Sequence, residues 1–432
     1  MKYFGTDGIR HKAKLFFEND LAYKVALAIA ELDNEEKTIC IARDTRVSGE
    51  DIRDELIKGF TLKNCKVIDF GVVPTPALAY MTVKFNANFG IMISASHNPP
   101  EYNGIKIFNK SGYKLTEKEE EFIEERIDSY DIKEKNNEMK SEAINGKEIF
   151  IDYLVKRVNF SLEGYKIKID CGYGAGSHLA KEVFEKLGAR VDSICDGYNG
   201  AMINVDCGST NIDNLKMNKD YDIGFSFDGD VDRVIAVDNE NHVIDGDAFL
   251  YIIGMALDKK GLLKNRFVVG TTMTNMSLEK ELKKNNIVLV RTDVGDKYIQ
   301  QSMIKNNYII GGEQSGHIIL DGLVKTGDGI YAACVLLKSL KEIGMMVSDV
   351  NKKYIPFPQK IVNVMTENKE CIKAKEVQDA LKEGEKMLDG NGRVVLRPSG
   401  TEPKIRIMVE ASDEKYIDPV CNLIKEAINK VN

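Results

Sequence analysis

The chain has 432 residues, of which 43% are hydrophobic. This length exceeds what one hydrophobic core usually supports, so we expect about two to four domains. The 67 acidic and 60 basic residues give a net charge of −7, which disfavours non-specific attraction to nucleic acid or to an anionic membrane. Nucleic-acid partners are therefore not expected, and an anionic ligand would have to be held by local basic residues.

Targeting, membrane and cysteine signals are also weak in this sequence. Residues 1–5 lack the apolar run of a signal peptide, and the longest apolar stretch, around residues 249–257, is too short to cross a bilayer. The eight cysteines are scattered and include no C-x-x-C pair, so we interpret them as buried thiols rather than disulfides or zinc ligands. A cytoplasmic protein with no membrane segment is predicted.

Short β-branched runs alternate with longer amphipathic stretches, which is typical of βα units in largely parallel sheets. In chain order the expected strands are 38–42, 66–70, 90–94, 104–108, 166–170, 222–227, 233–237, 267–270, 287–290, 308–311, 361–364, 393–396 and 405–410. Helices are expected from about Thr116, near 371–388 and at the end of the chain, and the polar residues 131–146 look like a loose connection.

This order predicts three similar mixed-sheet α/β domains followed by a smaller α+β domain. Their expected ranges are 1–150, 151–245, 246–356 and 357–432. The sequence contains no repeat strong enough to prove duplication of the first three.

Three aspartates alternate in a loop between two apolar strands. Asp228, Asp230 and Asp232 can converge on one hard cation without help from histidine or thiol, and magnesium suits such oxygen ligands. A calcium EF-hand loop is the obvious alternative, but it needs glycine where Arg233 stands and glutamate where Asn239 stands. The alternative that remains is a solvated acidic turn.

A serine loop follows the expected strand at residues 90–94. Ser96 lies at the carboxyl end of that strand, where ligands gather in α/β folds. A serine hydroxyl is a weak nucleophile that a base or a metal must activate, and His97 and Lys106 are nearby candidates. Alternatively, Ser96 only organises a turn before Pro99.

A third loop, residues 312–317, concentrates hydrogen-bonding groups. Glu313, Gln314, Ser315 and His317 supply carboxylate, amide, hydroxyl and imidazole, which suit the hydroxyls of a sugar ring. The glycine spacing mimics a phosphate-binding P-loop, but His317 and the isoleucine after it replace the required lysine and Ser/Thr. A P-loop kinase is excluded.

A basic loop near the C-terminus suits a phosphate dianion. Two guanidinium groups, two hydroxyls and a flexible glycine occur together there, and a surface turn with incidental charges is the alternative. The residues are Arg397, Ser399, Gly400, Thr401 and Arg406.

One further loop resembles a dinucleotide-binding fingerprint. Gly172 and Gly174 follow a strand, and Asp192 lies about 20 residues farther on. The third fingerprint glycine is Ser177 instead, so we interpret the segment as a tight strand-to-helix turn. A nucleotide-dependent oxidoreductase is the corresponding alternative function.

The motifs together resemble the α-D-phosphohexomutase family from one end of the chain to the other. The match also includes the opening Phe-Gly-Thr-Asp-Gly-Ile-Arg at residues 4–10, residues 204–210 and residues 294–296. The resemblance implies four domains around a central cleft. It also implies a phosphorylated Ser96 that activity requires, and one Mg²⁺ per chain. The implied ligands of that ion are Ser96, Asp228, Asp230 and Asp232.

The resemblance also implies roles for the other candidate residues. Glu313 and Ser315 would hold sugar hydroxyls, and Arg233 would also contact substrate. The non-reacting phosphate would be bound by Arg397, Ser399, Gly400, Thr401 and Arg406. Phosphate stabilisation and proton transfer are assigned to Arg10, His97, Lys106 and His317, and the choice of acid and base between the last two is open.

Four positions depart from the family pattern, and none of them is a residue with an assigned role. Val231 replaces a glycine, Tyr102 an aspartate, Met202 an asparagine and His11 a glycine. Val231 matters most, because a β-branched side chain restricts the backbone of the metal loop and could alter metal choice or affinity.

The implied activity moves a phosphoryl group between two oxygens of one hexose phosphate. Gln314 and the opening heptapeptide favour a hexosamine phosphate, which implies a role in amino-sugar metabolism, over mannose or glucose phosphates. The mannose and glucose activities of the same family remain the nearest alternatives, and a non-catalytic sugar-phosphate sensor is a more distant one. A homodimer is a further expectation from the family likeness.

Overall fold

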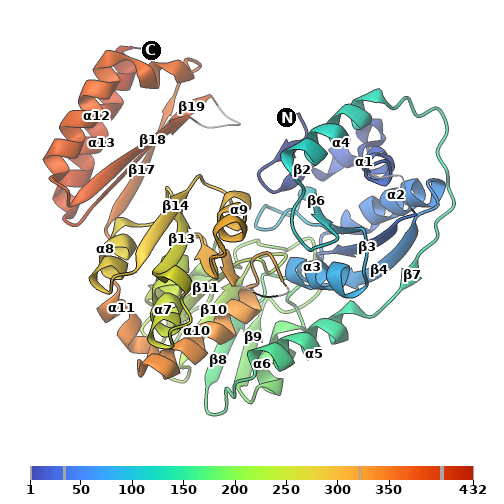
Figure 1. Ribbon diagram of the computed structural model, residues 1–432, viewed down its shortest axis with the longest axis horizontal. Helices are drawn as coiled ribbons and strands as arrows, with labels where there is room; N and C mark the ends of the chain where they lie inside the picture. Colours follow the sequence, from blue (N-terminus) through green and yellow to red (C-terminus); the bar gives the residue numbers. More distant parts are fainter. Residues whose placement is uncertain (1, 33–35, 321, 323, 399–402, 432) are drawn as a thin grey trace.

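The computed structural model describes residues 2–32, 36–320, 322, 324–398 and 403–431. These residues form four sheets, each accompanied by its own helices (Figure 1). The predicted class, three similar mixed-sheet α/β domains and a C-terminal α+β domain, is confirmed. No helix in the described ranges is both long and apolar enough to span a bilayer.

The first sheet is mixed and has seven strands. In spatial order they are β1 (Phe4–Gly5), β2 (Gly8–Lys12), β6 (Tyr102–Asn109), β5 (Phe89–Ile93), β3 (Thr38–Arg43), β4 (Lys66–Val72) and β7 (Glu142–Ala143). Its helices are α1 (Leu21–Ala30), α2 (Gly49–Leu62), α3 (Thr75–Lys84), α4 (Glu117–Ser129) and α5 (Gly146–Val158). The expected start of α4 is confirmed, because Thr116 caps it reciprocally with Glu119.

The second and third sheets are smaller and also mixed. The second contains β12 (Val243–Ile244), β11 (Val234–Asp238), β10 (Ile223–Phe227), β8 (Lys166–Asp170) and β9 (Arg190–Ile194), with helix α6 (Ala180–Lys186). The third contains β14 (Val288–Thr292), β13 (Phe267–Thr271), β15 (Ile310–Gly312) and β16 (Ile318–Leu320). Its helices are α7 (Gly246–Lys259), α8 (Met276–Lys284), α9 (Asp296–Asn306), α10 (Gly329–Ile343) and α11 (Val350–Lys353).

The C-terminal sheet is antiparallel and has three strands. They are β17 (Gln359–Met365), β19 (Lys404–Ala411) and β18 (Gly392–Pro398), covered by α12 (Lys375–Leu388) and α13 (Ile417–Lys430). Two sequence expectations need correction. The helix expected near 371–388 is not continuous. A short 3-10 turn covers Lys369–Lys373, and the α-helix itself, α12, begins only at Lys375. The connection at 131–146 is not wholly irregular, because β7 pairs with β4.

The first three sheets repeat one plan. In each, one strand lies between two parallel neighbours: β3 between β4 and β5, β8 between β9 and β10, and β13 between β14 and β15. The next strand in the chain then returns antiparallel, which gives the hairpins β5–β6, β10–β11 and β15–β16. They carry the serine loop, the aspartate loop and the Glu313–His317 loop respectively, so three of the sequence motifs occupy the same place in three related sheets.

The apolar cores explain how these sheets are held. One buried cluster runs through parts of the first three sheets, including Met92, Phe225 and Val268, whereas residues of the C-terminal sheet form a cluster of their own. Polar contacts attach that last unit to the third sheet. Arg393 donates to the carbonyl oxygens of Thr272, at 2.9 Å, and Thr274, at 2.6 Å. The C-terminal unit therefore has its own hydrophobic core and is joined to the third sheet by polar contacts.

The glycines of the Gly172 loop pack against the aspartate loop. A Cβ on Gly174 would lie 2.4 Å from the Gly229 carbonyl oxygen and 2.6 Å from its Cα. Gly172 donates its N–H to Asp170 at 2.9 Å. These glycines thus serve close backbone packing, as expected for a tight strand-to-helix turn, and this packing leaves no space for a pyrophosphate beside Gly174.

We predict that Gly174→Ala destabilises the protein by about 1–3 kcal/mol, because the new methyl group overpacks against backbone that cannot rotate away. Calorimetric melting should show a lower Tm. Gly197→Ala is the matched control, since a Cβ there meets nothing within 4 Å. Equal Tm values for the two variants would contradict this account.

Candidate active site

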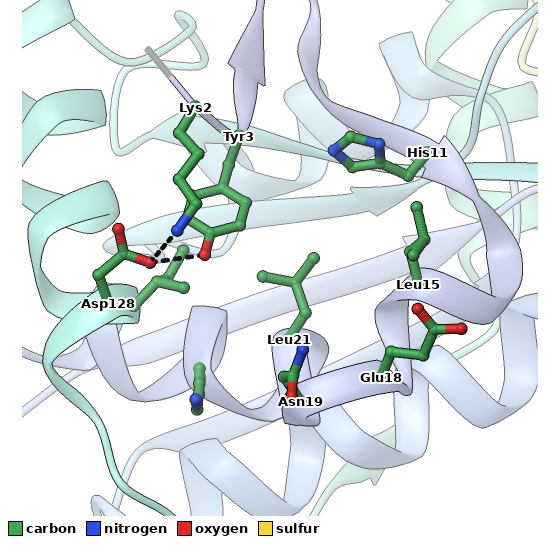
Figure 2. A pocket seen from close by; sticks show the side chains of 10 residues that line it. Lys2, Tyr3, His11, Leu15, Glu18, Asn19, Leu21 and Asp128 are labelled. Carbon is green, nitrogen blue, oxygen red and sulfur yellow. Dashed lines mark hydrogen bonds and ion pairs between the residues drawn. The ribbon is translucent and has the colours of Figure 1, made fainter.

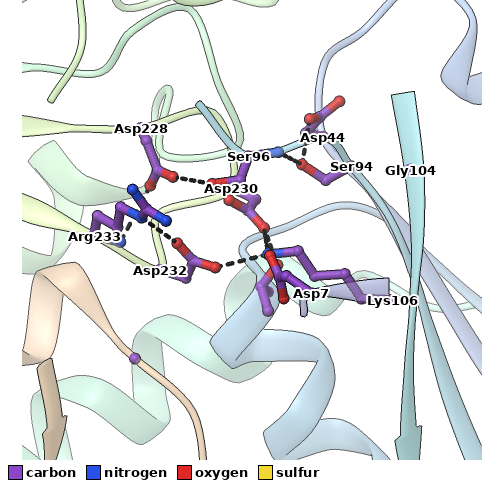
Figure 3. A network of polar contacts seen from close by, with 12 residues as sticks. Asp7, Asp44, Ser94, Ser96, Gly104, Lys106, Asp228, Asp230, Asp232 and Arg233 are labelled. Carbon is purple, nitrogen blue, oxygen red and sulfur yellow. Dashed lines mark hydrogen bonds and ion pairs between the residues drawn. The ribbon is translucent and has the colours of Figure 1, made fainter. Parts of the chain in front are cut away.

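The serine and aspartate loops meet in the structure (Figure 3). Ser96 is fully buried, and its Oγ donates a hydrogen bond of 2.5 Å to Asp228 Oδ2. His97 Nδ1 lies 3.3 Å from the same Oγ. Ser96 has a φ of +53°, in the left-handed region that non-glycine residues rarely adopt. Such a conformation persists only where surrounding contacts enforce it, as they do at many functional sites.

A buried arginine supplies those contacts. Arg46 is 1% exposed and donates from Nη2 to the carbonyl oxygens of Ser96, at 2.9 Å, and Asn98, at 2.7 Å. Its Nη1 donates to two more carbonyls of the loop, those of Pro99 and Tyr102. One guanidinium group therefore fixes the backbone of the serine loop at four points.

A buried carboxylate completes this support. Asp44 Oδ2 accepts from Arg46 Nε at 3.0 Å and from Ser94 Oγ at 2.6 Å. Ser94 Oγ in turn accepts from the Ser96 N–H at 2.9 Å. Asp44 and Arg46 were not among the residues that the sequence singled out, and their spacing carries no motif. A charged pair just after the expected strand 38–42 was the only available signal.

The three aspartates form the buried cluster that the sequence predicted. One carboxylate oxygen from each of Asp228, Asp230 and Asp232 lies within 4.8 Å of the others, and all three residues are at most 2% exposed. Asp230 Oδ1 and Asp232 Oδ1 are buried without a hydrogen-bond partner among the described residues. Buried carboxylate oxygens that accept no hydrogen bond suit a hard divalent cation, so the residues fit magnesium.

Burial and like charge govern the protonation of this cluster. Burial, followed by the neighbouring Asp232 and Asp230 carboxylates, raises the pKa of Asp228 well above its ordinary value. Burial alone would also raise the pKa of Asp232, but the Lys106 ammonium lowers it well below the usual range. The cluster thus depends on nearby positive charge, and Lys106 is the first source of it.

Lys106 lies directly beside the cluster. Its Nζ donates to Asp230 Oδ2 and Asp232 Oδ2, both at 2.7 Å, and lies 3.1 Å from Asp7 Oδ2. Burial opposes its charge, but the carboxylates outweigh burial and raise the pKa of Lys106 well above its usual value. The lysine that the sequence placed near Ser96 is therefore a buried cation that faces the aspartates.

His317 approaches the cluster from the opposite loop. Its Nδ1 lies 3.6 Å from Asp232 Oδ1, and its Nε2 lies 3.4 Å from Asp296 Oδ2. The Gly327 N–H donates to Nε2 at 3.1 Å. Burial would lower the pKa of His317, but Asp232 and then Asp296 raise it. The structure thus brings both proton-transfer candidates, Lys106 and His317, to Asp232.

A cavity of about 290 Å³ lies over the cluster and receives residues from all four sheet units. Its lining residues are Thr6, Asp7, Arg10, His97, Asp232, Arg233, Val294, Gly295, Asp296, Glu313, His317 and Arg397. Asp232 belongs both to the lining and to the aspartate cluster, so the cavity and the cation-binding residues are continuous. The volume suits a small polar ligand.

Arginine side chains make this cavity suitable for an anion. The Nε atoms of Arg10 and Arg233 are buried and have no hydrogen-bond partner among the described residues. Arg397 and Arg406 are direct cross-strand partners on β18 and β19. Burial, and then the charge of Arg406, lowers the pKa of Arg397. Like charges directly opposite each other on neighbouring strands repel, and a bound phosphate would offset that repulsion, so this pair suits phosphate.

The remaining predicted ligand residues differ in their placement. Glu313 lines the cavity, whereas Ser315 is exposed and is not among the lining residues. Gln314 turns away, donating to Asp245 Oδ2 at 3.0 Å and accepting from Gln359 Nε2 at 3.1 Å. Gln314 thus joins its loop to the start of the C-terminal sheet. The predicted phosphate ligands Ser399, Gly400 and Thr401 lie outside the described residues.

Two of the four departures from the family pattern directly neighbour site residues in the sequence. Val231 has a φ of +60° and is fully buried, so it keeps the left-handed conformation that a glycine would favour, at a cost of about 1–2 kcal/mol. His11 faces away from the active site. Strand alternation directs it to a separate cavity of about 520 Å³ shared with Lys2, Tyr3 and Asp128 (Figure 2), whereas its neighbour Arg10 lines the active-site cavity.

Known proteins show the same organisation. The chain matches phosphoglucomutase/phosphomannomutase alpha/beta/alpha domains I, II and III over residues 1–134, 148–241 and 245–356, and the C-terminal domain over 361–427. The chain belongs to this family. It is 43% identical to a phosphoglucosamine mutase of Finegoldia magna, covering 99% of this chain and 98% of that protein. Identity to the phosphoglucosamine mutase of Clostridioides difficile is 39%, covering 99% of this chain and 100% of the relative.

Solved structures of the family share the fold at lower identity. A phosphoglucomutase/phosphomannomutase family protein from Burkholderia thailandensis has a TM-score of 0.81 and 20% identity, covering 99% of this chain and 97% of that one. The Aspergillus fumigatus N-acetylphosphoglucosamine mutase, in complex with GlcNAc-6P and magnesium, has a TM-score of 0.70 and 17% identity. It covers 99% of this chain and 96% of that one.

We predict that Arg46→Lys lowers kcat on the order of 10–100-fold while changing KM little, because misplacing a reacting group by about 1 Å costs this much. Lysine offers three donors and cannot satisfy the four carbonyls and Asp44 together. Steady-state kinetics measure the split. Arg126→Lys, at a side chain that is 48% exposed on α4, is the control. An Arg46→Lys enzyme with an unchanged kcat would show that the serine loop does not need this support.

Proposed function

We propose that this chain is a phosphoglucosamine mutase, an isomerase that interconverts glucosamine 6-phosphate and glucosamine 1-phosphate. One observation carries the proposal. Ser96 Oγ lies in a buried aspartate cluster, beneath a cavity lined by arginines from three of the four sheet units. Relatives about 40% identical over the whole chain bear the same name. A role in making UDP-N-acetylglucosamine for cell-wall precursors, in the cytoplasm, follows as part of the proposal.

The proposed reaction starts from phosphorylated Ser96. The free hydroxyl of the sugar monophosphate attacks the phosphorus, the bond from phosphorus to Ser96 Oγ breaks, and a glucosamine 1,6-bisphosphate forms. That intermediate turns over within the cavity. Ser96 Oγ then attacks the other phosphate, which leaves the isomeric monophosphate and restores the phosphoserine. Atoms and charge balance over the cycle, so no co-substrate is consumed.

The chain's own residues position and neutralise the transferred group. Asp228, Asp230, Asp232 and the oxygen on Ser96 would hold magnesium, which when bound draws electron density from the phosphoryl group and offsets its charge. Arg10 and Arg233 line the same cavity, and their buried Nε atoms have no hydrogen-bond partner among the described residues. We assign the proton transfers of the two half-reactions to Lys106 and His317, the two groups beside Asp232.

The second phosphate of the substrate needs a separate site. Arg397 and Arg406 are cross-strand partners on the C-terminal sheet, and Arg397 reaches the cavity. We propose that this pair holds the non-reacting phosphate together with Ser399, Gly400 and Thr401. Glu313 would bind sugar hydroxyls, and Ser315 would join it when the exposed loop closes over the substrate. A site on the far side of the cavity can hold either end of the sugar, so one active site serves both half-reactions.

We predict that the purified, phosphorylated enzyme with Mg²⁺ converts glucosamine 6-phosphate faster than mannose 6-phosphate or glucose 6-phosphate. Phosphorus NMR follows each 1-phosphate as it forms. Ser96→Ala should lose activity by on the order of 10⁴-fold or more, because the reaction then has no acceptor on the enzyme. Faster turnover of mannose or glucose phosphate would assign the chain to the other activities of its family. Absence of turnover with all three sugars would refute a mutase.

We predict that Asp230→Asn weakens Mg²⁺ binding at least about 10-fold, because it removes one ionised oxygen ligand from the cluster. Titration calorimetry measures the affinity directly, without relying on turnover. Asp213→Asn is the control, because it removes the same single negative charge at an exposed position of the same domain. This variant should bind Mg²⁺ normally. The triad would not be the metal site if both variants bound equally well.

A further inference from the structure

Two thiols and one carboxylate meet at the carboxyl edge of the second sheet, apart from the aspartate triad. Asp170 ends β8, Cys195 directly follows β9, and Cys207 lies in the long connection that leads to β10. One donor atom of each residue lies within 4.8 Å of the other two. The three residues are far apart in the sequence, which is why no spacing motif indicates them.

We propose that Asp170, Cys195 and Cys207 form a binding site for a thiophilic divalent cation of the zinc class. Two sulfur donors and one carboxylate oxygen suit zinc, whereas magnesium prefers oxygen ligands alone. On binding, each thiol releases its proton to solvent and coordinates as thiolate. The site thus differs in chemistry from the oxygen-only triad, and it would give two of the eight cysteines a role that the sequence analysis did not assign.

The surroundings of the three residues already orient them as ligands. The Gly172 N–H donates to Asp170 Oδ1 and the Gly208 N–H donates to Asp170 Oδ2, both at 2.9 Å. A carboxylate oxygen has two lone pairs, so each of these oxygens can bind a cation while it accepts an N–H. Asn214 Nδ2 lies 3.4 Å from Cys195 Sγ as a donor. Partners of this kind fix the direction of metal ligands and tune their basicity.

Burial at the site is uneven in a way that suits metal entry. Asp170 and Cys207 are fully buried, whereas Cys195 is partly exposed. A cation can therefore reach the site past Cys195, and a water can complete a tetrahedral shell from the same side. The carboxylate also argues for a metal rather than a disulfide. A bond between the two sulfurs would leave Asp170 without a part in the cluster.

The cation would brace the loop that supports Ser96. Cys207 belongs to the same connection as Asn204, whose Nδ2 donates to the carbonyl oxygens of Ser96, at 2.9 Å, and Asn98, at 3.1 Å. The Asn204 N–H donates to the Gly172 carbonyl oxygen at 3.0 Å. A metal bound by Asp170, Cys195 and Cys207 would link three segments behind the serine loop. The role inferred for the site is structural, and it does not depend on the proposed sugar substrate.

Cobalt(II) is the probe that tests this site. The full-length enzyme, fully reduced and saturated with Mg²⁺ to fill the oxygen site, is titrated with Co²⁺ under nitrogen. A thiolate-to-cobalt charge-transfer band that saturates at one equivalent, and that one equivalent of Zn²⁺ abolishes, is the expected result. Oxygen ligands of the aspartate triad cannot give this band, so the readout is separate from mutase activity.

Matched variants identify the ligands. Cys195→Ser is the variant that should fold most safely, because the Cys195 side chain is partly exposed. It should weaken Zn²⁺ binding by more than roughly 10–100-fold, which is the cost of removing only the hydrogen-bond partner of a metal ligand. Cys65→Ser, in the first domain, should leave the band unchanged. Absence of the band in the folded wild-type enzyme overturns the proposal. A band that survives Cys195→Ser also overturns it. So does a Cys195–Cys207 disulfide, found by peptide mass spectrometry in protein that was purified under reducing conditions and binds no Co²⁺.

Discussion

The concentration of buried negative charge around Ser96 is the constraint on which the rest of this structure depends. Three aspartates lie in one loop at the carboxyl end of β10, with at most 2% of each exposed. Carboxylates in such a place are stable only with positive charge beside them. Lys106 provides a part of it from the neighbouring sheet, and a magnesium ion would provide the remainder. The first two domains are therefore tied together by charge at the point where the chemistry is proposed to occur.

The repeated plan of the first three sheets explains why the motifs converge. Each of three loops joins a parallel strand of its sheet to the antiparallel strand that follows it, and these loops carry Ser96, the aspartates and Glu313. Residues of all three loops, His97, Asp232 and Glu313, line one cavity. One apolar core runs through parts of these three domains, whereas the C-terminal unit has a separate core and polar contacts to the third sheet. A shared base with one separately packed unit suits an enzyme that must enclose an intermediate while it turns over.

Two residues of the proposed site have a strained backbone. Ser96 and Val231 both adopt left-handed conformations, and each is enforced by neighbours rather than by its own preference. For Ser96 the neighbours are Arg46 and Asn204, which hold its carbonyl oxygen. For Val231 the backbone is held by a hydrogen bond of 2.9 Å from the Gly329 N–H to its carbonyl oxygen. Stability is thus given up in two loops in order to aim a serine and three carboxylates at one point.

The sequence by itself determined the fold class, the positions of thirteen of the nineteen strands in the described residues and the residue types of the site. Strand periodicity and turn residues are local, and an Asp-x-Asp-x-Asp loop between apolar strands indicates a hard cation wherever the strands lie. The tertiary structure alone decided which distant residues meet. Arg46 binding the serine loop, Gln314 facing Gln359 rather than the cavity, and Cys195 beside Cys207 and Asp170 all depend on packing between segments far apart in the chain. A long-range contact leaves no periodic or spaced signal in a single sequence, because it is set by the geometry of the whole core and not by neighbouring residues.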